Sequence, residues 1–336
     1  MPRLLVDPKS GRWRTPLLFL TFLSSAFVLL LSLSIARPAA QVKPPAVDFR
    51  DVAGTSGLDF TNVCGLPSRT DYVLESTGCG VAIFDFDHDG NRDIFLVNGS
   101  RFSGFAPGTE PTNHLFRNLG NGKFADVTLQ AGLAKSGWGQ GVCVGDYDND
   151  GWDDLFVTYY GSNVLYHNNH NGTFSDVTAK AGLPVTGRRW GMGCSFLDYD
   201  LDGNLDLFVA NYVNFDVAAA PHRGENPYCI WKGVPVYCGP RGLPGASNIL
   251  YRNRGDGRFV DVSKQAGILS PSGYYGMGVV ASDFDRDGFP DIFVADDATP
   301  NILYHNERNG TFQDIAPLAG TAYNANGLLQ SSMGIA

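Results

Sequence analysis

Four short stretches of the sequence carry carboxylates at alternate positions, in the pattern D-x-D-x-D-G-x-x-D. The first runs from Asp85 to Asp93, with acids at positions 1, 3, 5 and 9 and Gly90 at position 6. Alternate acids on a short loop converge on one point, where their repulsion is costly unless a cation lies between them. The glycine permits a sharp turn that lets the carbonyl of position 7 point inward. A flexible ring of oxygen ligands favours a hard ion and suits Ca²⁺ better than Mg²⁺.

The predicted ligands are the four aspartates of each loop and the carbonyl of its seventh residue. They are Asp85, Asp87, Asp89, Asn91 and Asp93; Asp146, Asp148, Asp150, Trp152 and Asp154; Asp198, Asp200, Asp202, Asn204 and Asp206; Asp283, Asp285, Asp287, Phe289 and Asp291. An EF-hand does not fit, because position 12 should be glutamate and is a strand residue such as Leu96 or Val157. A solvated acidic turn is the alternative, and four intact repeats argue against it. We expect the ion to be chiefly structural.

Short apolar runs surround every acidic loop and must position it. A glycine-led run precedes each loop (CGVAIF, GVCVG, GMGCSFL and GMGVVAS), and a second run follows it (IFLVNG, LFVTYY, LFVANYV and IFVADD). These runs are rich in β-branched and aromatic residues, which is typical of buried strands. A third run, such as NHLFRN or NILYHN, leads into an Asn-Gly or Asp-Gly turn and a fourth run, such as KFADVT. Each unit therefore predicts four strands, with the acidic loop between the first and second.

Repeated four-stranded units are typical of the blades of a β-propeller, so the predicted fold class is all-β. A stacked β-solenoid fits less well, because its coils are usually shorter. Trp138, Trp190 and Tyr275 stand at one fixed distance before the last three acidic loops. We expect these rings to pack between neighbouring blades, with ligand stacking as the alternative.

The stretch from Tyr275 to Val294 combines an aromatic-glycine start, an acidic loop and a trailing apolar strand, and it resembles FG-GAP (VCBS-type) repeats. With the N-x-L-Y-x-N, N-G-x-F and Ala-Gly segments that follow, the units are similar to those of the secreted cartilage acidic protein / ASPIC-UnbV family. The resemblance covers about residues 48–336. It implies a seven-bladed propeller with Ca²⁺ in blade loops and a C-terminal ASPIC/UnbV domain. About four to five blades are expected here, as an incomplete propeller that stops within the first strand of its last unit.

The N-terminal segment predicts export. Residues 1–36 place four basic residues before an apolar run over 17–35, with small residues at its end. This pattern is typical of a signal peptide, and an uncleaved membrane anchor is the alternative. A Pro/Ala-rich linker is expected over 37–47, followed by the repeats over 48–336. Both interpretations place the repeats outside the cytoplasm, as a secreted, periplasmic or cell-surface protein.

Six cysteines fit an oxidising compartment. The candidate disulfide pairs are Cys229 with Cys238, and Cys64 with Cys79. The first pair lies within an irregular insertion, residues 212–247, where a zinc site with His222 is the alternative. Cys143 and Cys194 lie on predicted buried strands and are expected to be free thiols.

The sequence favours a binding or cell-adhesion scaffold. The insertion over 212–247 is the best candidate for recognition, because loops on a repeat scaffold commonly carry specificity. The expected partner is an extracellular protein or carbohydrate. A net charge of −9 argues against nucleic acid, and membrane contact is expected only through the N-terminal anchor. No hydrolase, zincin, P-loop or dinucleotide motif is present, so no catalytic residue is predicted. The alternative is a propeller lyase or hydrolase with a site formed by several blade loops.

Overall fold

The computed structural model describes residues 49–102 and 104–335. The predicted export segment over 1–36 and the linker over 37–47 lie outside these residues. Within the described parts of the chain, no helix is both long enough and apolar enough to cross a membrane.

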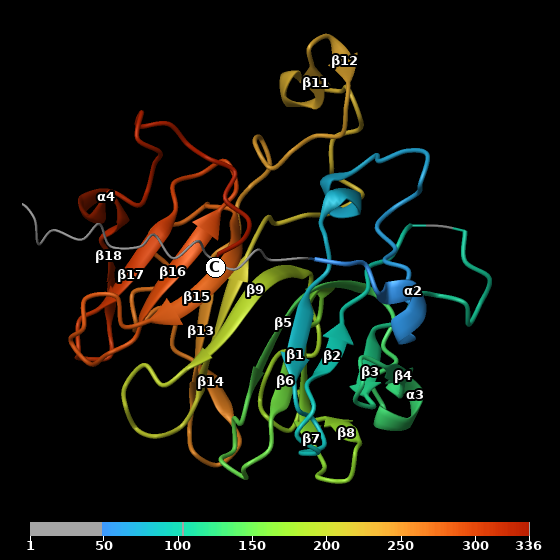
Figure 1. Cartoon of the computed structure of the whole chain (residues 1–336). Helices are drawn as coiled ribbons and strands as arrows, with labels where there is room; N and C mark the ends of the chain where they lie inside the picture. The colour runs from blue at the N-terminus through green and yellow to red at the C-terminus, as the bar shows by residue number, and fades with distance from the viewer. Residues whose placement is uncertain (1–48, 103, 336) are drawn as a thin grey trace, which may run out of the picture. The chain divides into compact units, whose positions relative to one another are not determined.

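The described chain forms four consecutive blades of four antiparallel strands each (Figure 1). Blade 1 contains β1 (Val81–Phe84), β2 (Asp93–Leu96), β3 (His114–Asn118) and β4 (Phe124–Asp126). Blade 2 contains β5 (Trp138–Gly145), β6 (Asp154–Gly161), β7 (Val164–Asn168) and β8 (Phe174–Asp176). Blade 3 contains β9 (Arg189–Leu197), β10 (Asp206–Asn211), β13 (Ile249–Asn253) and β14 (Phe259–Asp261). Blade 4 contains β15 (Gly276–Ser282), β16 (Asp291–Asp296), β17 (Ile302–Asn306) and β18 (Phe312–Asp314). The all-β fold, an incomplete β-propeller, is confirmed.

Each acidic loop is the connection between the first two strands of its blade, as the sequence predicts. The last residue of the first strand pairs with the ninth residue of the loop, so that Phe84 faces Asp93 and Leu197 faces Asp206. The same pairing joins Gly145 to Asp154 and Ser282 to Asp291. The sheet register therefore places all four loops at one equivalent corner of their blades.

Blades 2 and 3 are joined into one eight-stranded sheet, which the repeat pattern does not predict. The end of β6 pairs with the start of β9 through Tyr160 opposite Trp190 and Gly161 opposite Arg189. Both strands are longer than their counterparts in blade 1, and this extra length lets them meet across the blade boundary.

Glycines on the first strands let neighbouring blades touch backbone to backbone. A Cβ atom on Gly141 would lie 2.2 Å from the carbonyl oxygen of Met192 in the next blade. A Cβ on Gly193 would lie 2.4 Å from the carbonyl oxygen of Met277. Carbon and oxygen cannot approach so closely, so this spacing between blades requires glycine. The glycine-led runs of the sequence thus mark the blade contacts.

Aromatic side chains from the starts of the first strands form one cluster across the blades. Trp190 is fully buried, Tyr275 is buried, and Trp138 packs against them with Tyr212 and the inserted segment. The Trp190 and Tyr212 rings meet edge to face at 5.0 Å. Packing between blades is therefore confirmed for these aromatics.

A short helical turn ends three of the repeat-like segments. These turns are α2 (Ala53–Ser56), α3 (Thr128–Ala131) and α4 (Ala316–Ala319), and each is capped by a left-handed glycine. A Cβ on the cap Gly57 would lie 2.5 Å from the Phe124 carbonyl oxygen. Gly267 caps the corresponding turn of blade 3, and a Cβ added there would lie 2.8 Å from the Phe312 carbonyl oxygen. Residues 51–62 therefore pack on blade 1 as the end of one repeat packs on the next.

The insertion of blade 3 leaves the sheet after β10 and carries a small hairpin. It contains the 3-10 helix η2 (Pro227–Cys229) and strands β11 (Ile230–Trp231) and β12 (Val234–Pro235). Figure 1 shows this hairpin standing clear of the blade sheets. A second 3-10 helix, η1 (Val73–Ser76), precedes β1 and contributes Val73 and Leu74 to the aromatic cluster.

Candidate metal centres

Backbone hydrogen bonds hold the first aspartate of each acidic loop in place. In the first loop, the Asp85 carboxylate accepts hydrogen bonds from the N–H groups of Asp89 (3.1 Å) and Gly90 (3.0 Å). The equivalent pairs recur at Asp146, Asp198 and Asp283. The aspartate at position 5 accepts a hydrogen bond from the N–H group of position 7, as Asp150 does from Trp152 at 2.9 Å. The loop conformation is thus fixed by the same acids that the sequence predicts as ligands.

The aspartate at position 9 of each loop is buried at the base of the site. Asp154 accepts hydrogen bonds from the N–H groups of Tyr147 (3.3 Å) and Asn168 (2.8 Å). Burial raises the pKa of Asp93 to about 6, of Asp206 to about 7 and of Asp154 to about 8. A nearby dication would favour the charged carboxylates and lower these pKa values. The position therefore has the chemistry of a ligand that a cation would stabilise.

Carboxylate oxygens converge in the loops. Asp85, Asp87 and Asp93 each offer an oxygen within 4.8 Å of the others, and so do Asp146, Asp148 and Asp150. At position 3, one carboxylate oxygen of Asp87 (Oδ1) and one of Asp200 (Oδ1) are buried without a hydrogen-bond partner. A buried acceptor without a partner is costly, and a cation would satisfy it. The oxygen donor set fits Ca²⁺. An ion bound there would neutralise the acids and bind the two ends of the loop together.

Basic side chains reach into the same acids, which the sequence analysis did not foresee. Arg117 on β3 contacts Asp87 at 2.6 Å and Asp89 at 3.1 Å. Arg252 on β13 contacts Asp200 at 2.7 Å and Asp202 at 3.0 Å. The alternation of Arg and His in the N-x-L-[FY]-[RH]-N run was the available signal.

Histidines occupy the equivalent position in blades 2 and 4. His167 Nδ1 lies 3.3 Å from Asp148 and 3.4 Å from Asp154. His305 Nδ1 lies 3.1 Å from Asp291 and 3.6 Å from Asp285. An arginine is always charged, whereas a neutral imidazole can accept a metal or a proton. The third-strand position thus alternates between arginine and histidine along the chain, and in the fourth loop Arg308 also contacts Asp287, at 2.6 Å.

Arg117, which contacts the first loop from β3, should compete with a cation bound there. We expect Arg117→Gln to tighten Ca²⁺ binding at this loop by about three- to fivefold, because an exposed ion pair worth up to about 1 kcal/mol no longer has to be displaced. Titration calorimetry on the variant measures the change. Arg258→Gln, in the exposed turn after β13, is the matched control and should leave affinity unchanged. Equal affinities for the two variants would show that Arg117 does not compete.

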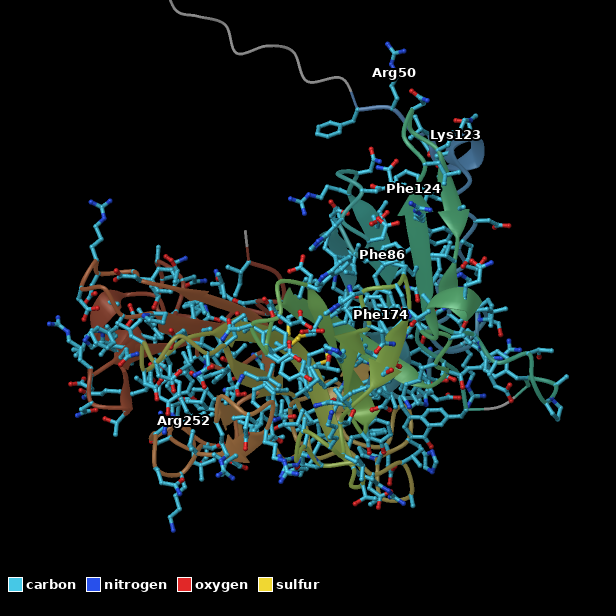
Figure 2. The ribbon with its side chains drawn as sticks, turned by 90° about the horizontal axis from the view of Figure 1, so that it is seen from below. Arg50, Phe86, Lys123, Phe124, Phe174 and Arg252 are labelled. Carbon is cyan, nitrogen blue, oxygen red and sulfur yellow. A yellow bond between two sulfur atoms is a disulfide. The ribbon has the colours of Figure 1, made fainter. Side chains whose placement is uncertain are left out.

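The second residue of each of the first three loops ties that loop to the next blade. Its carbonyl accepts a hydrogen bond from a third-strand asparagine of the following blade, as Phe86 does from Asn168 at 2.9 Å. Its ring packs on a fourth-strand phenylalanine of that blade, with the Phe86 and Phe174 centroids 6.2 Å apart (Figure 2). The same two contacts link Tyr147 to Asn253 and Phe259, and Tyr199 to Asn306 and Phe312. Ordering a loop therefore also orders a blade boundary.

Adjacent loops also touch one another. The His88 ring, at position 4 of the first loop, stacks on Trp152, at position 7 of the second, with centroids 3.9 Å apart. At the next boundary, Asn149 Nδ2 donates to the carbonyl of Gly203 at 3.0 Å. Position 4 is thus packed on the segment that offers the position 7 carbonyl in the following blade.

The cysteines divide into one disulfide and four free thiols among the described residues. Cys229 and Cys238 are joined by a disulfide within the insertion. This bond leaves no thiolate at either residue, so the alternative zinc site with His222 does not form. The suggested Cys64–Cys79 bond is wrong for this structure, since both are free thiols. The Cys64 thiol donates to the Thr77 carbonyl at 2.8 Å, and the Cys79 thiol donates to Asn62 Oδ1 at 3.1 Å.

Blades of four antiparallel strands, each with an acidic loop after its first strand, define a repeat protein of the β-propeller class. The FG-GAP-like repeat family matches residues 85–157, 146–209, 236–294 and 283–330. The chain belongs to this family. Each matched segment begins at or before an acidic loop and runs into later strands, as the blades do.

The curated relatives include cartilage acidic protein 1 of Homo sapiens, which is 28% identical over 243 residues. That alignment covers 68% of this chain and 32% of the human protein. The Xenopus tropicalis protein of the same name is 27% identical over 72% of this chain and 35% of its own length. The chain thus spans about a third of the length of these relatives.

A solved Agrocybe aegerita lectin structure, described as recognising non-reducing terminal N-acetylglucosamine, also aligns with this chain. It does so over 69% of this chain and 49% of its own, with 18% identity and a TM-score of 0.34. A superposition at that TM-score supports no argument about this chain.

Proposed function

We propose that the chain is an exported, calcium-stabilised β-propeller that serves as an extracellular binding or adhesion scaffold. The convergence of carboxylates in the blade loops carries the calcium part of this proposal. The proposed ligands are the four aspartates and the position 7 carbonyl of each loop. The family supports the same assignment, because an acidic loop lies in each of its matched segments.

Calcium would act on the scaffold mainly through the blade boundaries. Each loop carries its proposed ligands at positions 1, 3, 5, 7 and 9, and each of the first three loops holds the next blade through position 2. A cation that orders the loop fixes this contact as well. The ion therefore has a structural role and leaves recognition to other surfaces.

The hairpin of the insertion is the proposed recognition surface. Tyr228, Trp231 and Val234 are exposed by 58%, 62% and 53%. Lys232 Nζ lies 4.6 Å from the centre of the Trp231 ring. Apolar and aromatic side chains gathered on one exposed tip are typical of interaction sites, where tyrosine and tryptophan contribute most of the energy. The proposed partner is an extracellular protein or a carbohydrate.

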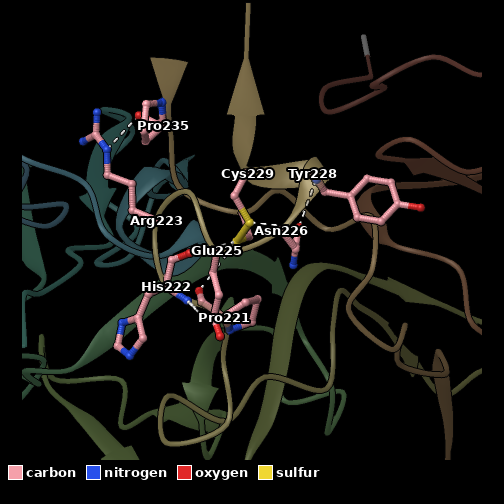
Figure 3. Close-up of a disulfide and its surroundings, with 9 residues drawn as sticks. Pro221, His222, Arg223, Glu225, Asn226, Tyr228, Cys229 and Pro235 are labelled. Atoms are coloured by element: carbon pink, nitrogen blue, oxygen red, sulfur yellow. Dashed lines mark hydrogen bonds between the residues drawn. A yellow bond between two sulfur atoms is a disulfide. The ribbon is translucent and has the colours of Figure 1, made fainter. Parts of the chain in front are cut away.

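The tip is held rigid before any partner binds. The disulfide closes the segment that carries β11 and β12, and Arg223 Nε donates to the Pro235 carbonyl at 2.8 Å (Figure 3). The figure shows the Tyr228 ring directed away from the disulfide. A preorganised loop loses less conformational entropy on binding. The insertion therefore has the rigidity that a recognition element needs.

Export is proposed from residues 1–36, whose basic and apolar pattern suits a signal peptide or a membrane anchor. The disulfide of the insertion supports an oxidising compartment. Expression of the gene with a C-terminal tag, followed by N-terminal sequencing of the exported product, tests cleavage near residue 36. A product found in the cytoplasm would contradict export.

The recognition surface is tested by affinity capture from the native extracellular fluid, with and without Ca²⁺, followed by binding measurements on the captured partner. We expect Trp231→Ala to weaken partner binding by tenfold or more, because a central aromatic anchor is worth about 2 kcal/mol or more. Tyr323→Ala removes an exposed aromatic of blade 4's closing segment and is the matched control. Equal affinity of both variants would place recognition elsewhere on the scaffold.

A further inference from the structure

Two free thiols lie together in the core between blades 2 and 3. Cys143 on β5 and Cys194 on β9 both pack against one cluster that includes Phe156, Leu207 and Val209. Neither thiol belongs to the acidic loops or to the insertion. The two strands are equivalent first strands of neighbouring blades.

The contact between the two strands brings the cysteines abreast. Gly141 of β5 meets the Met192 carbonyl of β9, where an added Cβ would lie at 2.2 Å. Cys143 comes two residues after Gly141, and Cys194 comes two residues after Met192. Because β5 and β9 are the first strands of neighbouring blades, residues that lie two positions beyond this contact on each strand are at the same height.

Phe156 of β6 lies beside both cysteines. In the β5–β6 register, Cys143 stands directly opposite Phe156. The Cys194 thiol donates to the carbonyl of that same Phe156, with the sulfur 3.7 Å from the oxygen. Both cysteines are therefore next to one residue of β6, and a disulfide requires their Cα atoms to come within about 7 Å of each other.

We propose that Cys143 and Cys194 form a disulfide that covalently joins blades 2 and 3. The bond would link two residues far apart in the sequence and close a loop through most of blade 2. Its effect would be to lock the blade boundary where both the glycine contact and the loop ties already lie.

The reaction is a two-step thiol–disulfide exchange with a disulfide oxidant, such as glutathione disulfide or the active-site disulfide of an oxidoreductase. One cysteine loses its proton to solvent and attacks the oxidant, which releases one thiol. The second cysteine then displaces the other half as a thiol, leaving the Cys143–Cys194 bond. Two protein thiols are oxidised and one disulfide is reduced to two thiols. Burial and the neighbouring Cys194 raise the pKa of Cys143 well above its usual range, so the reaction is expected to run faster during folding than in the folded chain.

The test refolds the 336-residue chain in glutathione disulfide, blocks remaining thiols, digests without reduction and maps the linked peptides by mass spectrometry. A Cys64→Ser/Cys79→Ser background removes the other free thiols. We expect a peptide pair joining Cys143 to Cys194. The melting temperature should rise by about 5 °C or more relative to the chain refolded with only Cys229–Cys238 oxidised.

A Cys143→Ala variant should lose both the linked peptide and the rise in melting temperature, and Cys194→Ala provides a second variant should the first fold poorly. Recovery of Cys143 and Cys194 as blocked thiols from a folded, glutathione-treated chain would overturn the proposal. So would recovery of each as a mixed disulfide with glutathione, because the sulfurs would then be unable to reach one another.

Discussion

A methyl group added at Gly141 is expected to force blades 2 and 3 apart. The Gly141→Ala variant should lose about 3 kcal/mol of unfolding free energy, the upper part of the range for overpacked cores. Its Cβ would lie 2.2 Å from the Met192 carbonyl oxygen. That oxygen also accepts a hydrogen bond of 2.5 Å from Thr158, whose hydroxyl accepts one from the Gly141 N–H at 2.8 Å. Denaturant unfolding followed by tryptophan fluorescence measures the loss.

Gly78→Ala is the matched control for this substitution. A Cβ at Gly78 meets nothing within 4 Å, and its backbone lies outside the left-handed region. The control should therefore unfold at about the wild-type midpoint. If Gly141→Ala also unfolds there, neighbouring blades do not require the close backbone contact.

Removal of Ca²⁺ is expected to lower the melting temperature by on the order of 10 °C. At about 2 mM Ca²⁺ and a dissociation constant of roughly 10⁻⁴ M, one loop gains about 1.8 kcal/mol, and four independent loops gain about 7 kcal/mol. Filling any of the first three loops should also stabilise a contact with the next blade, such as that of Phe86 with Asn168. Calorimetry with Ca²⁺ and with excess chelator measures the shift.

Loop variants show whether the shift comes from the predicted sites. Asp200→Asn keeps the shape of the aspartate at position 3, whose Oδ1 is buried, but removes its charge. If the four loops act alike, this variant should reduce the Ca²⁺-dependent stabilisation by about a quarter. Asp216→Asn, outside the acidic loops, should retain the full gain. An unchanged melting temperature in excess chelator would mean that the loops are stable without calcium.

The sequence was sufficient to predict the blades and the loops because both depend on local, repeated patterns. Alternating acids around Gly90 specify one tight turn, and the apolar runs on either side specify the strands that pair across it. Four copies reinforce one another, so a single irregular unit does not obscure the fold. The Cys229–Cys238 pair lies close in sequence within one insertion, which made it accessible to the same reasoning.

Contacts across the sheet were harder to predict. Arg117 reaches Asp89 from a different strand, and only the sheet register brings them together. Cys64 and Cys79 are free thiols that donate to Thr77 and Asn62, and no spacing rule predicts these partners. The pairing of β6 with β9 joins the ends of two long strands that belong to different blades, and the repeat pattern does not specify it.

The ties at position 2 give the scaffold a direction. Each of the first three loops secures the blade that follows it, so Phe86 acts on blade 2, Tyr147 on blade 3 and Tyr199 on blade 4. Stability should then add up as in a one-dimensional chain of nearest neighbours. Emptying one loop would weaken a single link, and opening would spread along the chain from that link. Under a pulling force, such links would yield one after another, at loads that depend on the calcium concentration around the protein.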